Sequence, residues 1–404
     1  MKKIIALVLA LVMVMSFAAC ANTQNEDANN DPAETTAPAY KLGGVGPLTG
    51  GAAIYGNAVK NAAEIAVEEI NALGGDIQFE LKFEDDAHDA EKSVNAYNTL
   101  KDWGMQIFLG SVTSAPGVAT SVEAQADNMF YLTPSASSTD VLGGVANPLT
   151  GTVDIARKAT VFQLCFMDPN QGSASAQYIF DQELGSKIAI IYKNDDVYST
   201  GIYNSFVAKA AELGLEIVST TTFTTDSQTD FSVQIADAQA NEADLVFLPM
   251  YYDAASLILT QANNVGYAPV FFGVDGMDGI LSVEGFDTAL AEGVVLLTPF
   301  NADAEDEATK AFVAKYQEKF NEVPNQFAAD AYDCVYAIYE ALQAVEVNTA
   351  MTASELGQIL TDKFAGDFTF DGLTGEGMSW DETGAVTKSP KGMVIQNGAY
   401  VGLE

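Results

Sequence analysis

The chain has little of what most catalytic and metal sites are built from. Among its 404 residues there is one histidine, one arginine and three cysteines. A Ser-His-Asp triad would have to use His88, and a zinc site with several His or Cys ligands is excluded by composition. We therefore expect no enzyme activity, no metal and no cofactor. Cys165 and Cys334, each flanked by apolar or aromatic residues, form either a disulfide or two buried thiols.

Basic residues are also scarce. Lys and Arg number 18 against 55 Asp and Glu, which gives a formal net charge of −37. Such a surface repels the phosphates of nucleic acids, so we expect no nucleic-acid partner. The same acidic surface also opposes electrostatic binding to anionic lipids. The plain alternative is that the charge only keeps the protein soluble.

One long apolar run is present, from Ile4 to Phe17, and it follows Lys2 and Lys3. It is too short for a membrane span and is typical of a secretory signal covering residues 1–20. Its end at Cys20 resembles the lipobox of bacterial lipoproteins. That resemblance implies a lipid on Cys20 and a place at the cell membrane, facing outside the cytoplasm. The alternative is ordinary cleavage that leaves a spare cysteine.

Residues 21–39 contain no Val, Ile, Leu or aromatic residue. Such a segment cannot bury enough apolar surface to offset its ordering entropy, so we expect a flexible tether. The folded part then begins near Tyr40. It is too long for one ordinary core, which favours two lobes.

From Tyr40 onward, short strand patterns alternate with helical ones. This alternation predicts an α/β protein with parallel sheets covered on both faces. The pattern runs through residues 40–133 and restarts near residue 187, which predicts two doubly wound lobes. Residues 138–160 show weak periodicity and several Gly and Pro residues, so we expect a loop excursion there. Helical patterns lie at 89–104, 116–127, 199–214, 305–321 and 326–345.

The glycine-rich stretch at residues 44–56, GVGPLTGGAAIYG, matches neither nucleotide motif. It lacks the G-x-G-x-x-G spacing, and no Lys-Ser/Thr pair follows its last glycines. What remains is a loop that carries Tyr55 to the start of a helix. The alternative is a plain surface connector.

With a single arginine, a bound carboxylate must be held by hydroxyls and by free N–H groups at helix starts. Two serine-rich segments follow successive predicted strands, at residues 110–116 and 133–139. Open α/β sheets bind ligands at such strand ends, which predicts a site here. Each segment can also be a simple turn.

Asp275 follows a predicted buried strand and lies between glycines, where its carboxylate suits an ammonium group. It can instead only shape a Gly-rich turn. Tyr198, Tyr251 and Tyr252 stand at further strand ends and can form a wall around a ligand. The acidic residues beside His88 indicate a solvated turn at the start of a helix rather than a cation site. We expect Asp89 to be the N-cap of that helix.

Several segments together resemble a known family. GPLTGGAAIYG, FLGSVTSAPGVA, YLTPSASSTD, DPNQG and VFFGVDG are similar, in this order, to the leucine/isoleucine/valine-binding type I solute-binding proteins of ABC importers. The resemblance covers residues 40–404. It implies two Rossmann-like lobes joined by three crossovers. The expected lobes are 40–168 with 299–371, and 169–298 with 372–404.

The resemblance also implies roles for single residues. Ser114 falls where the family places a hydroxyl on the ligand α-carboxylate. Ser135 and Ser137 fall on a loop that contacts the carboxylate and the ammonium group, and Asp275 falls where an acidic residue pairs with the α-ammonium. The aromatic wall positions are Tyr55, Tyr198 and Tyr251.

Two departures from the family stand out. His88 and Thr113 occupy the positions of a disulfide that founding members carry, and the excursion at 138–160 is longer than usual. The implied function is capture of an amino acid, branched-chain or otherwise apolar or aromatic, by hinge closure, and its delivery to an ABC permease with its ATPase. The alternative is a sensor of the same fold for a small amide, nucleoside or organic acid.

Overall fold

The computed structural model describes residues 38–403. The expected signal at 1–20, its Cys20 and most of the expected tether lie outside this range. In the described range the first strand begins at Tyr40, where the sequence predicts the folded part to start.

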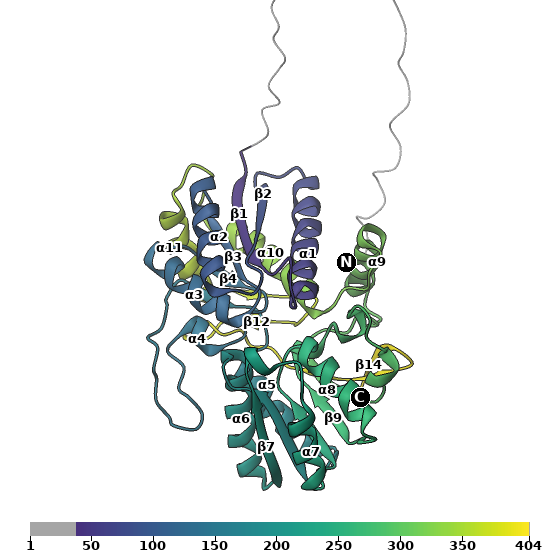
Figure 1. Cartoon of the computed structure of the whole chain (residues 1–404). Helices are drawn as coiled ribbons and strands as arrows, with labels where there is room; N and C mark the ends of the chain where they lie inside the picture. Colours follow the sequence, from purple (N-terminus) through teal and green to yellow (C-terminus); the bar gives the residue numbers. More distant parts are fainter. Residues whose placement is uncertain (1–37, 404) are drawn as a thin grey trace, which may run out of the picture. The chain divides into compact units, whose positions relative to one another are not determined.

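The first sheet has five parallel strands in the order β2-β1-β3-β4-β5 (Figure 1). Its central strands are apolar and buried, as expected for a sheet covered by helices on both faces. The strands are β1 (Tyr40–Gly46), β2 (Phe79–Asp85), β3 (Ile107–Ser111), β4 (Tyr131–Thr133) and β5 (Val161–Gln163).

The second sheet has seven strands in the order β14-β13-β10-β9-β8-β6-β7. Its parallel part, β7-β6-β8-β9-β10, repeats the strand order of the first sheet, and β13 and β14 add an antiparallel edge. The strands are β6 (Ile188–Lys193), β7 (Ile217–Phe223), β8 (Leu245–Leu248), β9 (Val270–Gly273), β10 (Val295–Thr298), β13 (Lys391–Gln396) and β14 (Ala399–Gly402). The repeated order confirms the predicted doubly wound α/β class.

Helices connect the strands, and several of them begin at a side chain that caps the first turn. Asp89 accepts a hydrogen bond from the Lys92 N–H, which confirms the predicted N-cap, and Thr352 forms a capping box with Glu355. The helices are α1 (Ala53–Ala72), α2 (Ala90–Trp103), α3 (Ser114–Ala126), α4 (Thr139–Leu142), α5 (Asp168–Asp181), α6 (Val197–Leu213), α7 (Ser232–Ala240), α8 (Tyr252–Asn264), α9 (Glu307–Phe320), α10 (Gln326–Gln343) and α11 (Ala353–Phe364). A small hairpin pairs β11 (Thr369–Phe370) with β12 (Met378–Ser379).

The chain passes between the two sheets more than once. It leaves the first sheet after β5 to enter β6, and after β10 it returns to place α10 against α1 and α11 against β3. It then runs back to β13 in the second sheet. The lobe boundaries given above stay a prediction.

Some sequence expectations need correction. The acidic turn before α2 is not simply solvated, because Asp86 is fully buried. The helix expected at 116–127 begins at Ser114, and the one expected at 199–214 begins at Val197. The candidate ligand residues Ser114 and Tyr198 therefore lie in the first turns of these helices. Of the two alternatives left open for Cys165 and Cys334, the structure has two buried free thiols rather than a disulfide.

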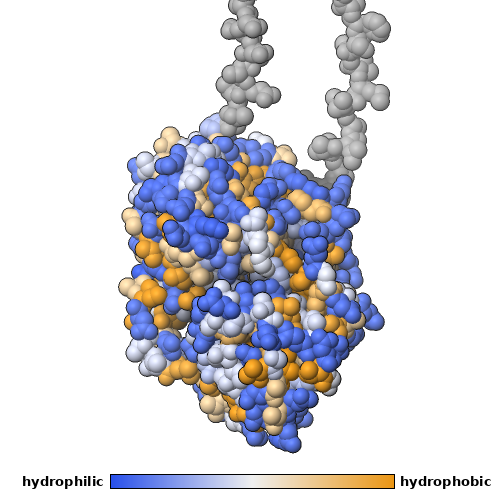
Figure 2. Space-filling view, viewed as in Figure 1, coloured by the Kyte–Doolittle hydropathy of each residue, from blue (hydrophilic) through white to orange (hydrophobic). Residues whose placement is uncertain are grey.

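The surface carries mixed side chains. On the face shown in Figure 2, hydrophobic residues lie scattered among hydrophilic ones. No helix within residues 38–403 combines the length and apolar character needed to cross a bilayer.

Candidate functional site

The candidate site is centred on Asp275, which lies two residues after the end of β9 and is 4% exposed. The Tyr198 hydroxyl donates a hydrogen bond to one carboxylate oxygen, and Gln171 Nε2 donates to the other at 2.8 Å. Both donors are neutral. Burial raises the pKa of Asp275 to about 7, and the bond from Tyr198 opposes that rise.

An aromatic cluster surrounds this carboxylate. The Tyr198 ring stacks on Tyr251 with 4.6 Å between centroids, and Tyr55 packs against Tyr251 at 5.6 Å. The Tyr55 hydroxyl donates to the Gly276 carbonyl oxygen, and its ring lies 4.4 Å from that of Phe327. Since Tyr55 belongs to α1 and Gly276 follows β9, this bond connects the segments that follow strands of the two different sheets.

Gly276 has to be a glycine for this cluster to form. A Cβ built there would lie 2.6 Å from the Tyr198 hydroxyl oxygen and 3.1 Å from a ring carbon of Tyr251. The Gly276 N–H also donates to the same Tyr198 hydroxyl at 2.9 Å. Any larger side chain would therefore push the tyrosine away from Asp275.

The serine-rich segments lie at the ends of β3 and β4, and their serine hydroxyls differ in whether they have a hydrogen-bond partner. Ser135 Oγ donates to the Val112 carbonyl at 2.6 Å, and Ser114 Oγ accepts from the Ser138 N–H at 3.2 Å. Ser137 Oγ is buried and has no partner among the described residues. All three serine side chains are buried, so the site is closed around them.

Asp168, the first residue of α5, joins the serine loop to Asp275. Its N–H donates to the Ser137 carbonyl at 3.1 Å. Burial raises the pKa of its carboxyl well above the ordinary range. Gln171, one turn further along the same helix, donates to Asp275 at 2.8 Å. The structure therefore places Ser137, Asp168 and Asp275 in one neighbourhood.

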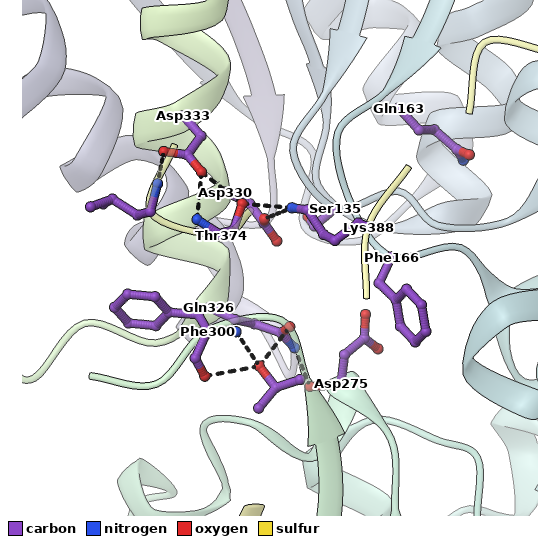
Figure 3. A network of polar contacts seen from close by, with 12 residues as sticks. Ser135, Gln163, Phe166, Asp275, Phe300, Gln326, Asp330, Asp333, Thr374 and Lys388 are labelled. Carbon is purple, nitrogen blue, oxygen red and sulfur yellow. Dashed lines mark hydrogen bonds and ion pairs between the residues drawn. The ribbon is translucent and has the colours of Figure 1, made fainter. Parts of the chain in front are cut away.

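A buried ion pair lies close by. Lys388 Nζ contacts Asp330 Oδ1 at 2.6 Å and Thr374 Oγ1 at 2.7 Å, and the Asp333 carboxylate accepts from Thr374 (Figure 3). Figure 3 also places Ser135 beside this network. The ion pair joins the segment before β13 to α10.

A cavity of about 460 Å³ adjoins the site. Its lining includes Ser138, Pro169 and Val197, the sequence neighbours of Ser137, Asp168 and Tyr198. The wall on one side comes from the 138–160 excursion and on the other from the start of α6. Within residues 38–403, no group of three or more His, Cys, Asp or Glu side chains is placed to hold a metal ion.

The two positions that resemble a family disulfide are also close together. His88 Nδ1 and Thr113 Oγ1 lie 2.8 Å apart, and the His88 ring contacts Tyr251 edge-on at 5.5 Å. Burial lowers the pKa of His88 to about 4, so the imidazole is neutral at pH 7. A hydrogen bond thus stands where the resemblance places a disulfide.

Contacts link four of the seven predicted ligand residues directly: Tyr55, Tyr198, Tyr251 and Asp275. Ser137 adjoins Asp168 through a backbone hydrogen bond. The hydroxyls of Ser114 and Ser135 instead make hydrogen bonds that connect the two serine-rich segments to each other. Sequence reasoning missed the contacts of Gln171 and Phe327. Gln171 lies in the DPNQG segment that carried the resemblance, and Phe327 is the second residue of α10, shortly after Pro324 and Asn325. Neither residue had a motif of its own to single it out.

Two doubly wound sheets, with a buried polar site between segments from both, define a ligand-binding protein of the α/β class. The family model for periplasmic binding proteins matches residues 39–395, and the chain belongs to this family. Proteins of this family work outside the cytoplasm.

Relatives and solved structures agree. The chain is 29% identical over 240 residues to the Leu/Ile/Val-binding protein homolog 3 of Brucella melitensis, a match that spans 58% of this chain and 61% of that protein. A leucine-binding protein, LivK, from Thermotoga maritima superposes with a TM-score of 0.78 at 25% identity, covering 90% of this chain and 98% of the other. LivJ from Streptococcus pneumoniae, a branched-chain amino acid transporter substrate-binding protein solved with isoleucine, gives 0.77 at 26%, covering 90% and 97%. These matches confirm the type I periplasmic binding protein fold.

Proposed function

We propose that this protein is the lipid-anchored substrate-binding component of an ABC importer and captures an amino acid. The ligand is a branched-chain or other apolar or aromatic amino acid. The permease and its ATPase receive it, and a lipid on Cys20 holds the protein at the outer side of the membrane. The relatives named above bind leucine, isoleucine or valine according to their names, which supports this class of ligand.

One observation carries the proposal: the Asp275 carboxylate is buried with only neutral donors on it. A buried carboxylate is costly unless a cation or several donors stabilise it. An α-ammonium group supplies both charge and donors. The hydroxyls and the N-terminus of α3 at Ser114 suit the α-carboxylate, because free N–H groups at a helix start attract anions.

The aromatic cluster then takes the ligand side chain. Tyr55, Tyr198 and Tyr251 come from both sheets' connecting segments, so a ligand held among them contacts both sides. Each side alone offers only part of these contacts. Binding therefore favours the closed arrangement by the contacts that closure adds.

The test is thermal unfolding of the purified protein, stripped of co-purified ligand, with amino acids, nucleosides, amides and organic acids. A ligand at about 1,000 times its Kd stabilises by about 4 kcal/mol. We expect stabilisation by branched-chain or aromatic amino acids. Stabilisation by another class alone would keep the fold and overturn the ligand assignment. Incorporation of labelled palmitate, lost in Cys20→Ser, tests the lipid anchor.

A further inference from the structure

The site holds more buried carboxyl groups than the protein pairs with cations. Asp330 is paired with Lys388 at 2.6 Å. Among the described residues, the side chains that donate to the Asp275 carboxylate, Tyr198 and Gln171, are both neutral. Asp168 is 0% exposed, and neither of its carboxylate oxygens has a hydrogen-bond partner within residues 38–403. A buried carboxyl group left in this way is unfavourable in the ligand-free protein.

Helix capping does not explain Asp168. An acidic residue at a helix start usually accepts N–H bonds from the first turn, but α5 has no side-chain cap and Asp168 accepts none of these bonds. Its carboxylate instead lies against α6, where a Cβ on Gly201 would be 2.7 Å from Oδ2. The glycine leaves room for this oxygen.

Three unpartnered buried atoms are thus close together: the two Asp168 oxygens and Ser137 Oγ. They belong to adjoining segments, since the Asp168 N–H binds the Ser137 carbonyl. Asp275 lies beside them, since it accepts from Gln171, one turn further along α5 than Asp168, and from Tyr198, one turn before Gly201 on α6. Two carboxylates and a hydroxyl match the three N–H donors of one primary ammonium group.

We propose that Asp168 is a second ligand-binding carboxylate, which receives the ammonium group of the ligand together with Asp275 and Ser137. This rests on the proposed function, because it places the same amino group. It narrows the ligand class to primary amines. A carboxylic acid of the same shape without the amino group leaves two buried carboxylates unpaired and is rejected.

The proposal has a consequence for protons. In the ligand-free protein burial favours the protonated form of both carboxyls, and an arriving ammonium favours the ionised form. Binding at pH 7 therefore releases protons, and affinity falls as the pH is lowered. The titratable groups acting on Asp168 or affected by it are Asp275, Asp196, Asp140, Tyr251 and Cys165.

The experiment is calorimetric titration of the purified wild type and of Asp168→Asn with L-leucine at pH 7, in two buffers of different ionisation heat. The two buffers give the number of protons released. We expect Asp168→Asn to bind about 10- to 100-fold more weakly, since a charged hydrogen bond is lost, and to release about one proton fewer per leucine. Gly201→Ala, which crowds the carboxylate without changing its charge, should also weaken binding.

Folding is checked by thermal unfolding without ligand. A ligand-binding role predicts that Asp168→Asn is at least as stable as the wild type, because an unpartnered carboxyl is removed. A structural role predicts a lower midpoint. Wild-type affinity and proton release in Asp168→Asn, with binding lost in Asp275→Asn, would overturn this proposal alone. A wild type that binds none of the amino acids would overturn the proposed function and this proposal together.

Discussion

The Tyr55 hydroxyl donates a hydrogen bond to the Gly276 carbonyl, across 221 positions of sequence. Tyr55 lies in the first turn of α1, after the first strand of one sheet, and Gly276 follows β9 of the other. Tyr55 also accepts from the Tyr252 N–H at 3.3 Å. A single side chain thus ties together the two halves that are proposed to close on the ligand.

Tyr55→Phe removes this bond but keeps the ring contacts. We expect amino-acid affinity to fall by about fivefold, because one buried neutral hydrogen bond is worth about 1 kcal/mol, with the order of preferred ligands unchanged. Tyr55→Ala should instead change which side chains are preferred, since it removes the ring from the wall. Calorimetric titration with leucine, valine and phenylalanine separates the two effects. Unchanged selectivity in Tyr55→Ala would show that residues 44–56 only connect a strand to a helix and do not contact the ligand side chain.

Asp275→Ala should abolish amino-acid binding. It removes the carboxylate proposed for the ammonium group and leaves the donors Tyr198 and Gln171 without their acceptor. The matched control is Asp278→Asn, another buried aspartate, which accepts from the Gln326 N–H rather than from the aromatic cluster. We expect near-normal affinity in the control. Equal binding by Asp275→Ala and the wild type would refute the role of Asp275.

Thr113→Val should destabilise the fold by about 1 to 2 kcal/mol, because the buried His88 Nδ1 loses its partner. Thr113→Ser keeps the hydroxyl and serves as the control. Urea unfolding at pH 7 measures both, since His88 is neutral there. If the two variants unfold alike, the hydrogen bond contributes nothing to stability.

Lys388→Met should cost about 3 to 5 kcal/mol, because it leaves Asp330 buried and without its cation. The control is Lys310→Met, whose partner Glu305 is exposed, and we expect a change below about 1 kcal/mol there. Chemical denaturation of the two variants compares them directly. A mild effect in Lys388→Met would show that Asp330 takes up a proton at little cost.

Stability should rise as the pH falls from 8.5 to 6.5. Burial raises the pKa of Asp275 and of Asp86 to about 7, so the folded protein binds more protons than the unfolded chain in this window. Asp168, whose pKa is also raised by burial, adds to this trend. His88 and Lys158 have lowered pKa values and act in the opposite direction, His88 below about pH 7.5 and Lys158 above about pH 7. Urea unfolding across this range should show the trend, and Asp86→Asn should reduce its slope, since Asp275 still titrates. A free energy of unfolding that does not change with pH in the wild type would contradict the raised pKa values of Asp275 and Asp86.

The sequence predicts the class of fold well. Strands that alternate with helices, several of which end at a glycine, can pack in few ways other than as an α/β fold. It also locates Asp275 and the tyrosines, which follow buried strands as polar or aromatic residues. It does not reveal that the Ser135 hydroxyl donates to the Val112 carbonyl of the neighbouring loop, or that Asp86 is buried in a turn rich in acids. Those facts depend on how loops pack against each other, which no local pattern encodes. Asp168 looks like an ordinary helix start until its missing partners are counted.

The most direct test compares L-leucine with 4-methylpentanoate, which has the same side chain and carboxylate and lacks only the amino group. Calorimetric titration of the wild-type protein at pH 7 gives both affinities. The account predicts binding of leucine and a loss of at least about 100-fold for the acid, because a site built to hold an amino group is left with unpaired buried carboxylates. Equal binding of the two would contradict the assignment of an amino-acid ligand.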